Sequence, residues 1–265
     1  MAGKIRVIML GCGGSQGVPT ATGDWGACDP ANPKNRRSRP SVVIQAPDAA
    51  GTVKTLLVDT GPDLREQMLR NDVTRLDGVL FTHSHADHTH GIDELRSFNR
   101  TQRMRLPIWA SAEAMGDLRQ RFGYVLEQND PAIAAFYKPT IDAHVIDGPF
   151  EAAGIEIVPF VQDHGFTNSL GFRIGDFAYS TDFVRLDDVA LAALQGVRTW
   201  IVDCVRIQPA HPTHCHLEAS LHWIGLIKPE RAVLTHLDPS ADYAAITRLL
   251  PPGVEAGWDG LVLEA

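Results

Sequence analysis

The stretch Phe81-Thr82-His83-Ser84-His85-Ala86-Asp87-His88 holds three histidines and one aspartate within six positions, directly after a run of apolar residues. An extended backbone repeats its side-chain direction every second residue, so His83 and His85 can reach one metal ion as the chain leaves a strand. Asp87 and His88 come about one turn later and can face a second ion. Imidazole and carboxylate ligands suit zinc, manganese or iron, and a carboxylate favours catalytic over structural use. The stretch therefore predicts a metal centre at the end of a buried strand.

One short loop cannot hold two metal ions, so further ligands should follow other strands. His164, Asp182 and His236 each come at or shortly after the end of a short apolar run that we expect to be a strand. His236 follows a threonine, as His83 does, and a carboxylate in the position of Asp182 can bridge two cations. We therefore expect these three side chains to complete the metal centre.

Two more aspartates are candidates for orienting the ligands. Asp59 ends an expected strand at 53–58, and Asp203 lies in an expected strand at 200–204. Carboxylates behind a metal centre commonly accept a hydrogen bond from the ring nitrogen of a histidine ligand that does not bind the metal. We predict this supporting role for both residues.

Composition and charge favour a small substrate. The chain has 265 residues, of which 44% are hydrophobic and 21% charged, so we expect a single globular domain over 1–265. The net charge of −8 argues against a broad surface for nucleic acid, which is bound through accumulated lysine and arginine. We expect a small phosphorylated substrate and no nucleic acid, and the composition leaves a homodimer open.

Cysteine usage and hydropathy indicate a cytoplasmic protein. The four cysteines form no C-x-x-C pair, which favours reduced thiols over a disulfide framework: Cys12, Cys28, Cys204 and Cys215. The apolar run at 5–10 contains Arg6 and reads as a first strand and not as a signal peptide. No stretch approaches the roughly 20 apolar residues that span a bilayer, so we expect no membrane contact.

The order of expected elements indicates an α/β (α+β) fold. Strands come in runs, beginning with 4–10 and a hairpin at 41–58, and helices are interspersed among later strands. This pattern predicts two sheets packed face to face with helices outside. Residues 112–140 are more loosely patterned, and we expect an insertion there, at the rim of the active site.

The first loop is the expected place for substrate. The glycines of 11–19 let backbone amides approach an anion closely, which makes Ser15 and Gln16 candidates for substrate binding. The later part of the loop holds a dense basic cluster at 34–39, and Arg37 is its candidate phosphate contact.

The 82–88 stretch, followed in order by His164, Asp182 and His236, resembles the metallo-β-lactamase superfamily over essentially the whole chain. The resemblance implies a four-layer αβ/βα sandwich with two metal ions at one edge, between the sheets. It also implies two ligand sets and a bridging residue, in this order: His83, His85 and His164; Asp87, His88 and His236; and Asp182.

Shorter motifs indicate which branch of the superfamily the chain resembles. Six of them, spread from end to end, are similar to the phosphoribosyl 1,2-cyclic phosphate phosphodiesterases of the carbon-phosphorus lyase pathway: 13–19, 57–61, 202–204, 213–217, 234–236 and 258–260. This resemblance implies a binuclear hydrolase that opens a small cyclic phosphate by attack of a metal-bound hydroxide. Two ions about 3.5 to 4 Å apart can generate that hydroxide at neutral pH. The resemblance makes His214 the general acid, and we assign a catalytic role to Asp87 as well.

Departures from related patterns disfavour reduction of oxygen or nitric oxide and disfavour antibiotic hydrolysis. His85 stands where redox di-iron members usually carry glutamate, and Asp182 stands where true β-lactamases usually carry cysteine. The phosphodiesterases hold a structural zinc with several cysteines in the first loop and a histidine after the last metal ligand. Here the loop has only Cys28 beyond the glycine-rich stretch at 11–19, and Asp238-Pro239-Ser240 follows His236. We therefore predict two divalent ions, zinc or manganese, and no structural zinc.

Three other functions stay open. A tRNA 3′-processing endonuclease has the same metal set and would need a basic surface, for which the candidates are Arg100, Arg103, Arg105, Arg119 and Arg121. A lactone or thioester hydrolase shares the scaffold, and a non-catalytic module would use the pocket to hold a nucleotide. The remaining histidines are interpreted as surface or packing residues: His90, His144, His211, His216 and His222.

Overall fold

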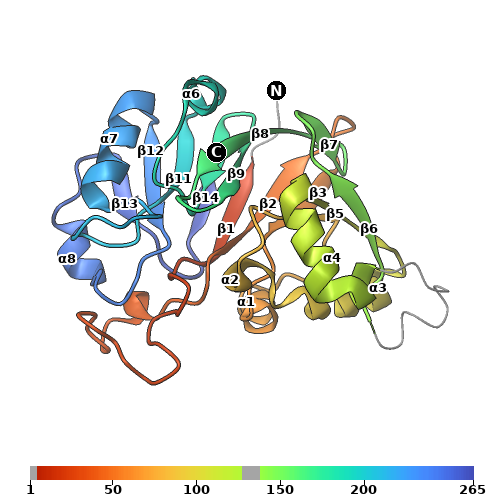
Figure 1. Ribbon diagram of the computed structural model, residues 1–265, viewed down its shortest axis with the longest axis horizontal. Coiled ribbons are helices and arrows are strands. Elements are labelled where there is room, and N and C mark those ends of the chain that lie inside the picture. The colour runs from red at the N-terminus through yellow and green to blue at the C-terminus, as the bar shows by residue number, and fades with distance from the viewer. Residues whose placement is uncertain (1–4, 127–137) are drawn as a thin grey trace.

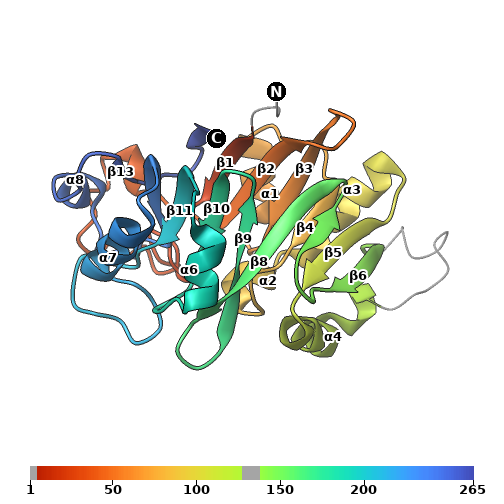
Figure 2. The same cartoon turned by 90° about the horizontal axis from the view of Figure 1, so that it is seen from above.

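The computed structural model describes residues 5–126 and 138–265, and two mixed sheets dominate that part of the chain (Figures 1 and 2). The first sheet has seven strands, in this order across it: β14 (Val262–Glu264), β1 (Arg6–Gly11), β2 (Ser41–Pro47), β3 (Val53–Val58), β4 (Gly78–Leu80), β5 (Leu106–Ala110) and β6 (Ile141–Val145). The second also has seven: β13 (Val254–Ala256), β12 (Arg231–Thr235), β11 (Thr199–Asp203), β10 (Phe177–Ser180), β9 (Asn168–Ile174), β8 (Ile155–Asp163) and β7 (Phe150–Ala152).

Helices cover the outer face of each sheet (Figure 2). On the first sheet these are α1 (Leu64–Arg70), α3 (Leu95–Gln102) and α4 (Ala112–Leu126), and on the second α6 (Asp188–Leu194), α7 (Leu217–Ile227) and α8 (Tyr243–Thr247). The short helix α2 (Ala86–Thr89) and the 3-10 turns η1 (Pro33–Asn35) and η2 (Ile92–Glu94) lie in loops. The resulting helix-sheet-sheet-helix layering confirms the predicted four-layer sandwich.

Strand β1 shows why the layers form. Val7 and Met9 are buried between the two sheets, whereas Ile8 and Leu10 are buried under the helices of the first sheet. Successive side chains of a strand point to opposite faces, so a continuous apolar run requires cover on both sides. The interior strands of both sheets therefore sit between a second sheet on one face and helices on the other.

Strand direction gathers the polar loops at one edge. β3, β4 and β5 are parallel to one another, as are β10, β11 and β12. β8 runs antiparallel to β9, which runs antiparallel to β10, so β8 ends at the same edge as β10. The aspartates and histidines predicted as ligands or as their supports all lie at this edge: Asp203 is the last residue of β11, and the others lie in the segments that follow β3, β4, β8, β10 and β12.

Some expected boundaries were wrong. The strand expected at 4–10 runs from Arg6 to Gly11, and the strand expected at 200–204 runs from Thr199 to Asp203. The segment 112–140 begins with α4, whose Ala114, Met115 and Leu118 are buried against the first sheet. The rest of that segment includes 127–137, which lies outside the described residues, so an insertion there stays a prediction. Within 5–126 and 138–265, no helix has the length and apolar character to cross a membrane.

Candidate metal centre

The strand-to-helix turn after β4 presents four of the candidate ligands. His83 and His85 lie on backbone that leaves β4, and His85 is extended, with φ −62° and ψ 157°, before α2 begins. Asp87 and His88 belong to the first turn of α2 and are buried. Gly61 follows β3 and packs against this turn, where an added Cβ would lie 2.4 Å from the carbonyl oxygen of Asp87. Close approach of the two loops therefore requires glycine at that position.

The first group of ligand atoms surrounds one oxygen of Asp182. The Nε2 atoms of His83 and His164 lie 3.7 Å and 3.6 Å from Asp182 Oδ2. The Nδ1 atom of His85 faces His164 Nε2 at 3.3 Å. All four ligand atoms lie within 4.8 Å of one another, so a single cation can contact them together.

The second group surrounds the other oxygen of Asp182. The Nε2 atoms of His88 and His236 lie 3.3 Å and 3.4 Å from Asp182 Oδ1, and they lie 3.4 Å and 3.6 Å from Asp87 Oδ2. Each oxygen of one buried carboxylate thus faces a different set of ligands. The structure brings together all seven predicted ligands in the arrangement that a bridging aspartate requires.

Several of these atoms have no hydrogen-bond partner among the described residues, although they are buried. They are the Nε2 atoms of His83, His88 and His236 and the Oδ2 atom of Asp87. A buried polar atom without a partner costs about 1 to 3 kcal/mol, so several converging on one point indicate a ligand. Imidazole and carboxylate donors fit divalent cations such as zinc or manganese. The residues present therefore fit a divalent metal centre.

Asp59 fixes two of the histidines in the form that binds metal through Nε2. Its Oδ2 atom lies 2.7 Å from His88 Nδ1 and accepts a hydrogen bond of 2.8 Å from the hydroxyl of Thr82. That hydroxyl lies 3.0 Å from His83 Nδ1 and is free to accept from it. The proton on each Nδ1 leaves each Nε2 with a lone pair. Asp59 therefore lies where the sequence predicted a supporting residue.

Asp203 supports the other side of the centre. Its Oδ1 atom accepts a hydrogen bond of 3.0 Å from the backbone amide of Asp182, and its Oδ2 atom accepts one of 2.9 Å from the amide of Cys215. The same Oδ1 lies 3.5 Å from His214 Nδ1, and His214 Nε2 lies 3.9 Å from Asp182 Oδ2. The predicted catalytic histidine is therefore at the centre, with a carboxylate behind it.

Backbone strain is concentrated at the same edge. Asp59, Asp182 and His236 have φ values of 66°, 56° and 62°, in the left-handed region that side chains other than glycine rarely adopt. Such conformations cost about 1 to 3 kcal/mol each and persist where the surrounding structure enforces them. Here each one turns a carboxylate or an imidazole toward the metal centre.

The electrostatics divide the histidines into two kinds. Burial lowers the pKa of His83 well below its usual value and also lowers the pKa values of His85 and His164. Burial opposes protonation of His236 too, but the nearby carboxylates of Asp182 and Asp87 outweigh it and raise its pKa to about 9. The pKa of His88 is raised well above its usual value in the same way. Cations that bind the second group must therefore displace protons.

The raised pKa of His236 predicts that the stability of the metal-free protein depends on pH. The pKa rises from 6.5 to about 9 on folding, so its contribution is fully present below pH 6.5 and is lost as the pH rises through about 9. Because one pKa unit is worth about 1.4 kcal/mol, we expect the free energy of unfolding to fall by ~3 kcal/mol between pH 6.5 and about 9.5. Urea unfolding of chelator-treated protein measures this fall in the free energy of unfolding. His236→Asn should flatten this slope, and an equal slope in both proteins would contradict the assignment.

A second prediction concerns Asp59. In Asp59→Asn an uncharged amide replaces the carboxylate that accepts from His88 and Thr82, so both imidazoles lose their fixed orientation. We expect metal affinity to fall by about 10- to 100-fold, measured by competition with a chromogenic chelator. Asp77 is also buried and accepts a hydrogen bond from the amide of Thr55, at a distance from the ligands, so Asp77→Asn is the matched control. Equal metal affinity in Asp59→Asn and the control would exclude the supporting role.

A cavity of about 220 Å³ adjoins the metal centre, and we call it the side cavity. Its lining comes from the first loop and from the loops after β11 and β12: Gly14, Ser15, Gln16, Val205, Arg206, His211, His214, His236, Asp238 and Pro239. Ser15 and Gln16 thus lie where the sequence predicted contact with substrate. Two polar residues of this lining were not singled out from the sequence, Arg206 and His211. A His-x-x-His spacing, from His211 to His214 in one loop, was the available signal.

The position of Arg37 in the structure does not support the prediction that it contacts phosphate. The backbone of Arg37 pairs with Val18 through hydrogen bonds of 2.8 Å in both directions, and its side chain is directed into the loop. It is 2% exposed, and its guanidinium contacts Cys28 Sγ at 3.8 Å and Asn35 Oδ1 at 3.3 Å. Arg37 therefore holds the loop together, and it does not line the side cavity, where Arg206 is the arginine present.

The first loop also lies against the segment that follows His236. Cys28 Sγ donates to the carbonyl oxygen of Pro239 at 3.4 Å, and Asn35 Nδ2 donates to Asp242 Oδ2 at 2.7 Å. These hydrogen bonds join the first loop to the segment after His236. The sequence predicts that these two segments hold no structural zinc, and that absence stays a prediction.

Comparison with known proteins identifies the class. A family model described as a beta-lactamase superfamily domain matches residues 54–237. The chain therefore belongs to the metallo-β-lactamase superfamily, which the fold and the His/Asp cluster also define. Within it, the chain lies close to the PhnP family. The crystal structure of a new diphosphatase from that family is 32% identical, with a TM-score of 0.88, over 100% of this chain and 98% of that one.

Two further relatives extend the comparison. An octanoyltransferase of Porphyromonas gingivalis is 31% identical over 258 residues, which are 97% of this chain and 51% of the relative, so this chain spans about half its length. The short form of human tRNase Z is 16% identical, with a TM-score of 0.69, over 97% of this chain and 98% of that one. At that identity the likeness shows the fold alone. The family model and the geometry of the site together place a candidate metal centre in a metallo-β-lactamase fold.

Proposed function

We propose that this chain is a binuclear phosphodiesterase that opens a small cyclic phosphate ester, of the phosphoribosyl or nucleotide type. The observation that carries the proposal is the position of Asp182. Its two oxygens face two separate ligand groups, at distances of 3.3 to 3.7 Å. The similarity to a diphosphatase of the PhnP family supports chemistry at phosphorus.

The chain's own residues perform the remaining steps. When bound, two divalent ions supply an activated water as nucleophile and neutralise charge on the phosphate oxygens. His214 lies beside the centre and the side cavity, so its imidazolium can donate a proton to the oxygen that leaves phosphorus. Asp203 lies behind that ring, where its carboxylate orients the imidazole and stabilises its charged form. Ser15 and Gln16 border the space in which the ester lies.

The donor set leaves zinc and manganese as the proposed metals, because histidine and carboxylate bind both. All four cysteines are buried and unpaired. This supports our placing the enzyme in the cytoplasm, where thiols stay reduced.

A nucleic-acid substrate has less support. Two of the five arginines considered for a tRNA-binding surface are in ion pairs with neighbouring acids, Arg105 with Asp142 at 2.6 Å and Arg121 with Asp117 at 3.6 Å. Their charges are therefore partly neutralised, and we propose a small phosphorylated molecule as the substrate.

Phosphorus NMR tests the proposal directly. Metal-defined protein is incubated with a cyclic ribose phosphate, a 2′,3′-cyclic nucleotide, a linear diester and a tRNA precursor. The proposal expects ring opening of a cyclic ester, and the chemical shift of the product shows which ring oxygen leaves. Turnover of only the tRNA, or of only lactone and thioester substrates assayed in parallel, would replace it with another hydrolase. No turnover together with tight nucleotide binding would indicate a binding module.

A further inference from the structure

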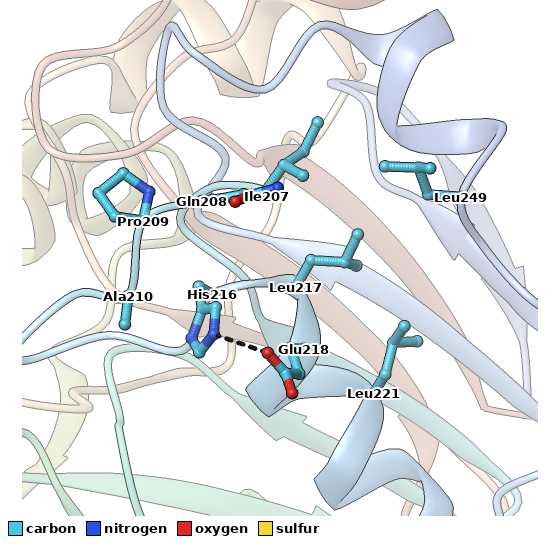
Figure 3. Close-up of a pocket in the computed structure, with 9 residues that line it drawn as sticks. All are labelled: Ile207, Gln208, Pro209, Ala210, His216, Leu217, Glu218, Leu221 and Leu249. Carbon is cyan, nitrogen blue, oxygen red and sulfur yellow. Dashed lines mark ion pairs between the residues drawn. The ribbon is translucent and has the colours of Figure 1, made fainter.

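The loop after β11 separates residues of different chemistry into two cavities. Ile207, Gln208, Pro209 and Ala210 line a larger cavity of about 650 Å³, whose other lining residues come mainly from α7 (Figure 3). Arg206 and His211, at the two ends of the same stretch, line the side cavity at the metal centre. Arg206 and His211 therefore lie on the side of the metal centre, whereas the mostly apolar residues between them line the other cavity.

Hydrogen bonds fix the orientation of His211. Its Nδ1 atom accepts from the backbone amide of Thr213 at 3.3 Å and lies 3.3 Å from the Thr213 hydroxyl. A backbone amide can only donate, so Nδ1 carries the lone pair and Nε2 carries the proton in the neutral ring. The ring of His211 lies next to that of His214, with centroids 5.0 Å apart. His211 therefore offers an N–H donor beside the proposed general acid.

The same loop residue ties His211 to a metal ligand. The carbonyl oxygen of Thr213 accepts a hydrogen bond of 2.7 Å from His164 Nδ1. Thr213 therefore joins a ligand of the first group to the wall of the side cavity. A substitution at His211 that disturbed Thr213 would also disturb the metal centre, and any test must separate these two effects.

Arg206 and Asp238 also line the side cavity, and as an ion pair they offer donors and acceptors there without a net charge. The Nη2 atom of Arg206 lies 2.9 Å from Asp238 Oδ2, and the two side chains are 26% and 17% exposed. Asp238 Oδ1 accepts from the amide and the hydroxyl of Ser240, at 2.8 Å and 2.6 Å. The arginine is thus already paired, and the carboxylate would repel a second phosphate. Hydroxyl groups, each of which donates and accepts, match such a wall better than an anion does.

We infer that the side cavity binds the hydroxyl-bearing, sugar-like part of the ester, and that His211 is a specificity-determining residue that donates Nε2–H to one of its oxygens. The inference rests on the proposed function, since it names the part of the substrate next to the reacting phosphate. A volume of about 220 Å³ is several times that of a water molecule, whose share of liquid volume is about 30 Å³, and it leaves room for a small polyol.

Two substitutions separate donation from support of the loop. His211→Asn places an amide oxygen near the position of Nδ1, where it can accept from Thr213, and removes the donor at Nε2. His211→Gln reaches farther and places an amide nitrogen near the position of Nε2. The control is His222→Asn, because His222 is exposed on α7 and contacts the ring of Trp223. Metal content of all three variants is measured in parallel.

The kinetic readout is the ratio of kcat/KM for adenosine 2′,3′-cyclic phosphate to kcat/KM for bis-p-nitrophenyl phosphate, which has no hydroxyl groups. We expect this ratio to fall at least about tenfold in His211→Asn, the effect of losing one hydrogen bond to a substrate, and to recover in part in His211→Gln. The control should keep the wild-type ratio. Equal losses on both substrates, with lower metal content, would show that His211 serves only to hold Thr213, and would overturn the inference.

A binding measurement decides the inference even without turnover. Calorimetry compares ribose 5-phosphate with inorganic phosphate on metal-loaded protein. We expect His211→Asn to weaken ribose 5-phosphate at least about fivefold more than phosphate, since only the ribose presents hydroxyl groups. Parallel changes for the two probes would overturn the inference and leave the proposed function standing. Absence of diester hydrolysis by the wild type, with selective ribose binding, would overturn the proposed function instead.

Discussion

Asp182→Asn should reduce phosphodiester turnover by at least about a thousandfold and should lower bound metal from two ions to one or none. The carboxylate has one oxygen toward each ligand group, and the amide offers one weaker oxygen donor and an N–H group that repels a cation. Asparagine also tolerates the positive φ of 56° at this position, so the fold should survive the change. Steady-state kinetics and elemental analysis of dialysed protein measure the two effects.

The control for Asp182 is an aspartate outside the site. Asp176 is half exposed and lies 3.9 Å from Arg198, so Asp176→Asn should keep both turnover and two metal ions. Circular dichroism of the three proteins checks the fold. Two bound metals and normal turnover in Asp182→Asn would show that this carboxylate does not bridge the centre.

His214→Ala should keep two metal ions and lose about 10²- to 10⁴-fold in turnover of esters with poorly leaving alcohols. The loss should be less than about tenfold for bis-p-nitrophenyl phosphate, because p-nitrophenolate leaves without being protonated. His214 is buried, lies at 3.5 Å from Asp203 and lines the side cavity, so it can reach the departing oxygen. Kinetics across a series of leaving groups measures the expected steeper dependence on the pKa of the alcohol.

Metal analysis tests the competing role of His214. Its ligand atom lies within 4.8 Å of those of Asp182, Asp203 and His236, so a cation could be held there as well. Loss of a metal ion in His214→Ala, with equal losses on all leaving groups, would identify a ligand and remove the general acid. His216→Ala is the matched control, because His216 lies two residues away and lines the larger cavity instead.

Local sequence was sufficient to find candidate ligands that the structure brings together. His83, His85 and His88 follow an apolar strand at spacings that an extended chain and one helical turn convert into a common direction. His164, Asp182 and His236 could be found because each follows a short apolar run, and the ends of strands of like direction meet at one edge. The alternation of apolar runs and helices predicted two packed sheets with helices outside, and the resemblance to the superfamily implied the four-layer sandwich.

The roles of Arg37, Arg206 and His211 depended on the tertiary structure. Nothing within the cluster at 34–39 shows that the backbone of Arg37 pairs with Val18 and that its side chain is buried within the loop. Likewise, His211 and Arg206 line a cavity only because the loops after β11 and β12 fold toward the first loop. Short-range periodicity indicates a set of ligands, because side-chain direction along a strand repeats every two residues. The walls of a pocket come from contacts between distant loops, whose backbone directions no local pattern specifies.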